Sequence, residues 1–291
     1  MSVEFGIQKA KHLFLEMDKK NPDINHDYLM FEKHDGWYGY IDFPACTIKS
    51  RAHREIPAVT RLSNEIHKRR PDVRGRLIFE IMIEGMEVDS FHELNGILNR
   101  KSEEAEGVYL RVHDFIHNFH FCHLDAITRY NFAAEIVQRL GMSQVRLSPI
   151  LGISKAPLDW YQEAEKIQFR GGEGLILKQS NALYMPDSRV SSLMKIKEEV
   201  TVEMQVIKVI EGLGEHQGQA GKLICKDVAG QLHEIGMGCM KHDERKAILI
   251  NPLEIINSVV EVKAMKKLKD GKFREPRFKA RRYDKGVHEL G

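Results

Sequence analysis

The spacing of apolar residues changes near residue 199, and this change constrains the fold more than any other feature of the chain. Beyond it, apolar and polar residues alternate in short segments separated by glycines, at 200–212, 221–236, 258–268 and 274–283. A helical pattern interrupts them near 241–249. Alternation of this kind is typical of half-buried strands, and several short strands in succession favour a small closed barrel. We therefore predict an all-β domain over 200–291, of which the OB-fold is a common nucleic-acid-binding form.

The first 199 residues mix helical and strand patterns. Apolar residues at helical spacing predict helices over 7–20, 58–70, 124–140 and 157–169. Runs rich in β-branched and aromatic residues predict strands over 75–84, 107–116, 173–178 and 191–197. Two further strands are expected on either side of a turn at Asp35-Gly36. The chain is therefore expected to be α+β, with one mixed domain over 1–199 and the barrel over 200–291.

The net charge of +2 conceals a basic segment near the end of the chain. Between Lys263 and Lys285 there are eleven lysines and arginines against three acidic residues. Aliphatic and aromatic residues are interleaved with these cations, which indicates folded strand rather than a solvated tail. A folded basic surface is the electrostatic footprint expected for a polyanion such as nucleic acid.

Other features exclude several classes of protein. No apolar run approaches the roughly 20 residues that a membrane-spanning helix needs, and the first 20 residues lack the pattern of a secretory signal. Four cysteines, at Cys46, Cys122, Cys225 and Cys239, are far apart in the sequence. This spacing argues against a zinc ribbon and a disulfide scaffold. A cytoplasmic location is expected, or the cytoplasm or nucleus of a host cell if the source is a virus.

The segment Glu32-Lys33-His34-Asp35-Gly36 carries the first candidate chemistry. A lysine, whose ordinary pKa is about 10.4, attacks phosphorus only as the free amine. Neighbouring cations and apolar groups can lower that pKa, and an Asp-Gly turn lets the backbone fold back and hold the amine over a phosphate. A Lys-x-Asp-Gly segment is also frequent in ordinary exposed turns. Residues elsewhere must decide between these two interpretations.

Charged residues recur on the predicted strands that follow. Glu80 interrupts an apolar strand, Glu173 and Lys178 begin and end another, and Lys195 and Lys197 alternate on a third. Residues two apart on a strand share a face, so the last pair can direct two cations at one anion. Charges on strands also prevent sheets from aggregating. Their succession after Lys33 favours a shared site.

In this order, these elements resemble the motifs of the covalent nucleotidyltransferase superfamily, and within it those of ATP-dependent DNA ligases. Lys33-His34-Asp35-Gly36 is similar to the nucleophile motif. The elements that resemble the next motifs are Ser50-Arg51, Phe79-Glu80, Val112-His113-Asp114-Phe115, Glu173 to Lys178, and Lys195-Ile196-Lys197. The OB region ends in Arg274-x-Pro276-x-Phe278 and Arg282-Tyr283-Asp284-Lys285, similar to the terminal ligase motifs. The resemblance extends from about Tyr28 to Lys285, and the small size is similar to the minimal ligases of phages and large viruses.

The resemblance implies a nucleotidyltransferase domain of antiparallel sheets with helices, followed by an OB-fold domain. It implies that Lys33 becomes adenylated by ATP, and that the AMP activates the 5′-phosphate of a nick in duplex DNA. The residues implied to bind ATP or AMP are Glu32, Arg51, Glu80, His113, Lys178, Lys195, Lys197, Arg282, Asp284 and Lys285. Glu173 and Glu80 would hold Mg²⁺ or Mn²⁺. Arg51, Lys266, Lys267, Arg274 and Arg277 would contact DNA, and the protein is expected to act as a monomer.

Two positions depart from the family pattern. Tyr38 stands where the family usually has an arginine, and His113 stands where it usually has an aromatic residue that stacks on adenine. A neighbouring cation could replace the missing arginine, and an imidazole can also stack, with less apolar area.

Other functions fit part of the sequence. An mRNA guanylyltransferase shares the lysine motif and the C-terminal motif but uses GTP, and an RNA ligase shares the lysine chemistry. Ser50-Arg51 and the Arg274 to Phe278 pattern favour a DNA ligase. A non-catalytic OB-fold protein would explain only the basic C-terminal region. The histidines His113, His117, His120 and His123, with Cys122, could hold zinc, but their alternation with phenylalanines favours a strand and loop.

Overall fold

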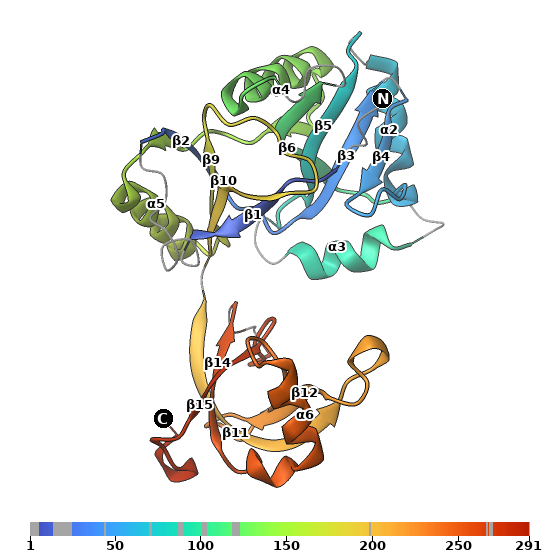
Figure 1. Ribbon diagram of the computed structural model, residues 1–291. Helices are drawn as coiled ribbons and strands as arrows, with labels where there is room; N and C mark the ends of the chain where they lie inside the picture. The colour runs from blue at the N-terminus through green and yellow to red at the C-terminus, as the bar shows by residue number, and fades with distance from the viewer. Residues whose placement is uncertain are drawn as a thin grey trace. The chain divides into compact units, whose positions relative to one another are not determined.

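The structure is a computed structural model that describes residues 6–13, 25–43, 45–69, 72–86, 90–100, 104–117, 123–197, 199–265, 267 and 270–290. It divides into two compact units, residues 1–197 and 198–291, and each is described by itself. Figure 1 shows two sheets with helices in the first unit and a barrel in the second. The predicted α+β class is confirmed.

One sheet of the first unit has the strand order β1-β10-β9-β2-β8. Its strands are β1 (Lys9–His12), β10 (Arg189–Lys197), β9 (Gly174–Gln179), β2 (Tyr28–Glu32) and β8 (Gly152–Ser154). All neighbours pair antiparallel except β1 and β10, which are parallel. Helix α5 (Pro157–Phe169) packs on this sheet through Trp160. The Trp160 ring meets the ring of Tyr28 edge-on, with centroids 5.0 Å apart.

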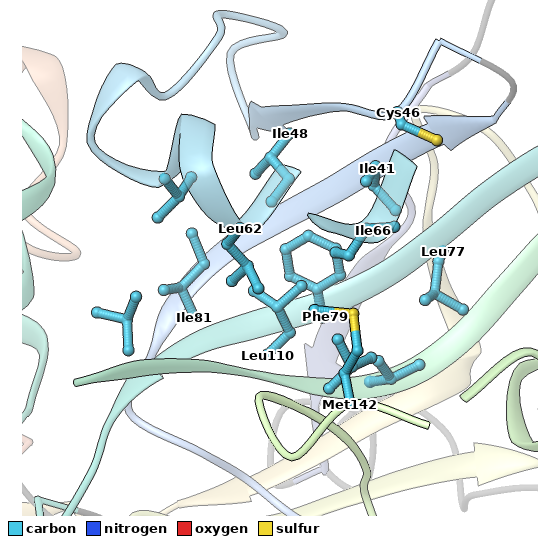
Figure 2. Packing of buried hydrophobic residues seen from close by; sticks show 14 of the residues in the cluster. Ile41, Cys46, Ile48, Leu62, Ile66, Leu77, Phe79, Ile81, Leu110 and Met142 are labelled. Carbon is cyan, nitrogen blue, oxygen red and sulfur yellow. The ribbon is translucent and has the colours of Figure 1, made fainter. Parts of the chain in front are cut away.

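The other sheet has the order β4-β3-β5-β6-β7. Its strands are β4 (Thr47–Ser50), β3 (Trp37–Phe43), β5 (Gly75–Ile83), β6 (Val108–His117) and β7 (Val145–Leu147). Helices α2 (Thr60–Arg69), α3 (Ser90–Leu98) and α4 (Ala126–Leu140) contribute to one buried cluster with this sheet. Figure 2 shows Ile41, Phe79 and Leu110 of the strands packed with Ile66 of α2. The opposite face carries a smaller cluster around Tyr40, Ile78 and Tyr184.

The segment that contains Lys33 connects the two sheets. Strands β2 and β3 on either side of it are confirmed, but they belong to different sheets and do not pair as a hairpin. Gly36 fits the crossing because a Cβ there would lie 2.5 Å from the sulfur of Met82 and 2.8 Å from the carbonyl oxygen of Ile81. Lys33 therefore lies where the chain leaves one sheet for the other.

The predicted helices over 58–70, 124–140 and 157–169 are confirmed as α2, α4 and α5. The helix expected over 7–20 is wrong where the structure describes it, because Lys9–His12 form strand β1; residues 14–24 lie outside the described residues. Strand β1 pairs with β10, whose residues are some 180 positions away. Local spacing carries no information about so distant a partner, which explains the error.

The second unit is a closed barrel with the order β11-β12-β13-β15-β14. Its strands are β11 (Val200–Glu211), β12 (Ala220–Lys226), β13 (Leu232–Gly236), β14 (Val259–Ala264) and β15 (Arg277–Arg282). Helix α6 (His242–Ile250) lies between β13 and β14 in the sequence and buries Ile248 in the barrel core. The five-stranded barrel agrees with the predicted OB-fold. No helix among the described residues is long and apolar enough to span a membrane.

Candidate functional site

A cavity of about 540 Å³ lies in the first unit and is lined by strands of both sheets. Seven of the residues predicted to form the site line it: Glu32, Lys33, Arg51, Glu80, His113, Lys178 and Lys195. They come from β2, β5, β6, β9, β10 and two connecting segments. The fold therefore brings together charged residues that are up to 163 positions apart in the sequence. A pocket that gathers polar groups among apolar walls is the usual form of a small-molecule site.

Lys33 forms an ion pair at the edge of this cavity. Its Nζ lies 2.6 Å from Oε2 of Glu173, and both side chains are mostly buried. The backbone N–H of Lys33 donates to the carbonyl of Gly174 at 2.8 Å. Gly174 has φ of +145°, and a Cβ there would lie 2.1 Å from the carbonyl oxygen of Ile196. The glycine therefore lets β9 begin close to β10, which places Glu173 beside the lysine.

Glu80 contributes a carboxyl group to the cavity, whereas Glu173 is not among the residues that line it. Burial raises its pKa to about 7, while Lys33 and Arg51 oppose this shift and Glu173 supports it. A carboxyl group with this pKa exchanges its proton near neutral pH. Glu80 therefore interacts electrostatically with both members of the Lys33–Glu173 pair.

Two lysines of β10 take different positions. Lys195 lines the cavity, and its pKa falls to about 8 because of burial and the nearby charges of Lys197 and Lys33. Lys197 pairs with Gly174 across the β9–β10 ladder and is buried, but it is not among the residues that line the cavity. Lys195 is therefore the cation of this pair that is available to an anion inside the cavity.

Lys178 belongs to a buried ionic network. Its ammonium donates to Asp114 at 2.8 Å and to the carbonyl of His113 at 3.1 Å. Arg129 of α4 donates to the same carboxylate at 3.0 Å, and to the carbonyls of Leu124 and Ala182. Burial opposes ionisation of Asp114, yet Arg129 and Lys178 hold the pKa of that carboxyl well below its usual range. Arg129 was not predicted as a functional residue; its signal is an arginine on the otherwise apolar face of α4.

His34 and His113 form a partly buried, uncharged part of the cavity wall. Burial lowers the pKa of each imidazole to about 3, assisted by Arg111 and Lys33 for His34 and by Lys178 for His113. Both rings are therefore uncharged at physiological pH. Phe31, Ile78 and Ile176 line the same cavity. Such surroundings suit a flat aromatic base better than a charged group.

Arg51 lies in the turn that follows β4. The guanidinium carbon stands 4.9 Å from the centroid of the Tyr38 ring, so the arginine stacks on the residue that departs from the family pattern. Glu32 instead directs its carboxylate at Arg170, 2.6 Å away. The cavity also includes Lys9, Arg189 and Tyr184. None of these three residues was predicted to belong to the site, and Lys9 was expected in a helix.

The second unit holds its own charged cluster. Arg282 forms two hydrogen bonds with Asp284, at 2.7 and 2.9 Å, and also contacts Glu203. Lys285 donates to the other oxygen of Glu203 at 2.8 Å. Glu203 on β11 therefore holds both cations of the predicted C-terminal motif. This role of Glu203 was not predicted, because it depends on the pairing of strands that are far apart in the sequence.

The predicted DNA-contacting residues of the second unit lie in and before β15. Arg277 begins β15 and is exposed, and Arg274 is partly exposed in the preceding turn. The Lys267 ammonium lies 5.7 Å from the ring centroid of Phe273; Lys266 lies outside the described residues. Of the histidine-rich segment, residues 118–122 also lie outside them. Within the described part of the chain, no group of three or more His, Cys, Asp or Glu side chains could hold a metal ion.

The fold is similar to that of ATP-dependent DNA ligases. A Lig E DNA ligase structure, described as DNA binding with a minimal scaffold, matches 96% of this chain and 100% of its own with a TM-score of 0.78 and 22% identity. The match to the bacteriophage T7 ATP-dependent DNA ligase in complex with ATP covers 97% of this chain and 100% of the ligase chain, with a TM-score of 0.58 and 16% identity. The match to Chlorella virus DNA ligase-adenylate covers 96% of this chain and 100% of the ligase chain, with a TM-score of 0.52 and 17% identity.

No protein-family model and no curated protein sequence matches the chain. The structural matches confirm the resemblance at the level of the fold.

Proposed function

We propose that this protein is an ATP-dependent DNA ligase that carries AMP on Lys33 and seals nicks in duplex DNA. The observation that carries the proposal is the cavity lined by Lys33, Glu80 and Lys195, with Glu173 paired to Lys33, within a fold like that of such ligases. A lysine with a carboxylate partner, a second carboxyl group and further cations at one cavity suit transfer of a phosphoryl group from a nucleotide.

In the first step, the Lys33 nitrogen attacks the α-phosphorus of ATP. The N–P bond forms as the bond to the bridging oxygen of pyrophosphate breaks, which leaves AMP on the lysine. Glu173 lies within hydrogen-bond distance of the amine and so holds it in place and can accept a proton. Lys195 and Arg51 are the cavity cations that would stabilise negative charge on the phosphate.

The base would occupy the part of the cavity formed by His34, His113 and the apolar residues. A neutral His113 can stack on a purine without the cost of burying a charge. Lys178 donates hydrogen bonds to Asp114 and to the carbonyl of His113. We therefore assign it two roles: it fixes the position of His113 in the cavity wall, and it contacts the nucleotide.

The residues present fit a divalent cation that is shared with the substrate. Mg²⁺ is commonly held by one or two carboxylates together with phosphate oxygens and water; Glu173 pairs with Lys33, and Glu80 lines the cavity that Lys33 also lines. When bound, the ion would neutralise phosphate charge. Mn²⁺ could replace it, because it also prefers oxygen ligands.

In the second unit, Arg282, Asp284 and Lys285 would orient the pyrophosphate of ATP during the first step. Lys266, Lys267, Arg274 and Arg277 would contact the DNA backbone, with Arg51 meeting the 5′-phosphate of the nick. Phosphate contacts dominate the affinity of such surfaces and make it depend on salt. Binding of nicked DNA should therefore weaken steeply as the salt concentration rises.

Incubation with α-labelled ATP or GTP and Mg²⁺, followed by a denaturing gel, tests this function. We expect label from ATP on the wild-type chain and none on Lys33→Ala. Label from GTP alone would instead support an mRNA guanylyltransferase, and no label from either nucleotide would support a non-catalytic binding protein. Matched nicked duplexes of DNA and RNA distinguish a DNA ligase from an RNA ligase, and sealing of the DNA nick is the expected result.

A further inference from the structure

Two tyrosines of β3 face the same side of their sheet. Trp37, Ile41 and Phe43 pack with the core beneath the helices, whereas Tyr38 and Tyr40 belong to the cluster on the opposite face. This alternation follows from the period of two along a strand. Tyr38 also lines the cavity and lies opposite Glu80 in the β3–β5 ladder.

Each tyrosine contacts the turn that follows β4. The Arg51 guanidinium carbon stands 4.9 Å from the centroid of the Tyr38 ring. The Tyr40 hydroxyl lies 3.0 Å from Nδ1 of His53, and these two rings meet edge-on with centroids 5.8 Å apart. Because β3 and β4 form an antiparallel pair in which Gly39 faces Ser50, the chain beyond Ser50 passes alongside Tyr38.

The turn itself is closed by backbone hydrogen bonds. The N–H of Ser50 donates to the carbonyl of Arg54 at 2.8 Å, and the N–H of His53 donates to the carbonyl of Ser50 at 2.9 Å. His53 adopts a left-handed conformation with φ of +60°, which is unusual for a residue with a side chain and needs support from its surroundings. The contact with Tyr40 supplies that support. The turn is thus joined to β3 through His53.

The Arg51 side chain depends on Tyr38 for its direction. Arg51 is an exposed residue, and an exposed arginine loses considerable side-chain freedom when it is held in one orientation. An aromatic face offers a cation an attractive surface that still leaves the N–H groups available to a ligand. Burial raises the pKa of Tyr38 well above its ordinary value, so the ring is neutral and the guanidinium is not neutralised by it.

We propose that Tyr38 is a positioning residue that holds the Arg51 guanidinium at the cavity for a substrate phosphate, and that Tyr40 fixes the same turn through His53. The inference rests on the proposed ligase function, in which the phosphate is the 5′-phosphate of the nick. The family usually has an arginine at the position of Tyr38. Tyr38 replaces that arginine indirectly, because it orients the guanidinium of Arg51 toward the phosphate.

A double-mutant cycle tests this role. The variants are Tyr38→Leu, Tyr38→Phe, Arg51→Ala and Tyr38→Leu with Arg51→Ala, and the measurement is single-turnover sealing of a nick by enzyme that already carries AMP. Misplacement of a phosphate ligand by about 1 Å can slow a reaction by roughly 100-fold. We expect Tyr38→Leu to lose about tenfold or more, Tyr38→Phe to retain the rate, and the double variant to be no slower than Arg51→Ala.

The chain offers a matched control in the same sheet. Arg146 stacks on Tyr109 at 4.3 Å, and Tyr109 does not line the cavity. Tyr109→Leu should therefore seal nicks at the wild-type rate per folded molecule, which circular dichroism quantifies. If Tyr38→Leu does not fold, Tyr40→Phe removes the hydroxyl that contacts His53 and should raise KM for the nick.

Two results would overturn the proposal: wild-type sealing by Tyr38→Leu, or losses from Tyr38→Leu and Arg51→Ala that multiply in the double variant. For Tyr40→Phe, an unchanged KM would count against the role of the turn. Failure of the proposed function would look different, since the wild-type protein would then neither take label from ATP nor seal a nick.

Discussion

The Nζ atom of Lys33 and Oε2 of Glu173 lie 2.6 Å apart although 140 positions separate the two residues in the sequence. The pairing of β2 with β9 creates this contact, because it sets the residue after β2 beside the residue before β9. A candidate nucleophile and a candidate metal ligand thus share one ion pair. A ligand that binds in the cavity either leaves the Lys33–Glu173 pair intact or replaces one of the two residues as the partner of the other.

Glu173→Gln should slow the formation of the Lys33–AMP adduct. The amide keeps the shape of the side chain but cannot accept a proton from the lysine or bind a cation as a carboxylate does. Loss of a positioned acid or base typically costs roughly 100-fold or more, and the variant should also need more Mg²⁺. Rates of labelling at a series of Mg²⁺ concentrations measure both effects.

The matched control is Glu163→Gln, which breaks the surface pair of Glu163 with Lys166 on α5. It should label like the wild type. Equal labelling rates for Glu173→Gln and Glu163→Gln would show that the Glu173 contact is not needed for adenylation.

Glu80 should make the stability of the protein fall as the pH rises. Its pKa is 4.5 in the ordinary state and about 7 in the folded protein because of burial, so the folded state binds more protons within this window. Stability therefore declines from about pH 4.5 to about pH 7. Glu80→Gln removes the titration and should gain roughly 3 kcal/mol over the wild type at pH 8 relative to pH 4.5. Urea denaturation at the two pH values measures the difference, and parallel changes in both proteins would refute it.

Asp114→Ala should destabilise the first unit strongly. The change leaves the Arg129 and Lys178 side chains buried without their shared carboxylate, and removal of one member of a buried ion pair costs about 3–5 kcal/mol. Because the pKa of Asp114 lies well below its usual range, its contribution is present at neutral pH and is lost on acidification. The midpoint of urea denaturation at pH 7 measures the effect.

Glu84→Ala provides the comparison, since Glu84 pairs with Arg146 at the surface and such pairs contribute at most about 1 kcal/mol. Similar losses from the two substitutions would contradict the account of the buried network.

Glu203→Gln should impair the reaction with ATP and spare the later steps. Glu203 holds Arg282 and Lys285 side by side, and an amide cannot pair with two cations. We expect labelling by ATP to slow about fivefold or more, in line with the energy of charge-assisted hydrogen bonds, while a nick that already carries AMP is sealed at the normal rate.

Glu234→Gln is the control for this change, because it breaks an exposed pair with a single cation, Lys222, on neighbouring strands of the same barrel. Faster labelling by Glu203→Gln than by the wild type would mean that Glu203 restrains the two cations rather than orienting them.

The strands and helices with strong periodicity could be predicted from the sequence. Helix α4 begins with Asp125, whose side chain accepts from the N–H of Thr128, and ends at Gly141 in a left-handed conformation; both signals are local. Strand β1 could not be predicted, because its pairing with β10 is a long-range contact. Short strands such as β7 and β8, with three residues each, give no period to detect.

The order of charged motifs predicted most of the charged residues that line the cavity, but it did not exclude Glu173 and Lys197, which do not line it, and it did not indicate how the residues pair. Lys195 lines the cavity and Lys197 does not, although both lie on the same strand. The role of Tyr38 depends on a stack with Arg51 across the β3–β4 pair, and that of Glu203 depends on barrel closure. Both contacts arise from tertiary structure, so a motif could not reveal them.

Peptide mapping of the adduct tests the central claim most directly. The protein is incubated with ATP and Mg²⁺, digested, and analysed by mass spectrometry under conditions that preserve the phosphoramidate bond. We predict AMP on the peptide that contains Lys33 and on no other peptide, followed by its loss when nicked DNA is added and the nick is sealed. AMP on a different lysine, or a protein that seals nicks without any adduct at Lys33, would contradict the account.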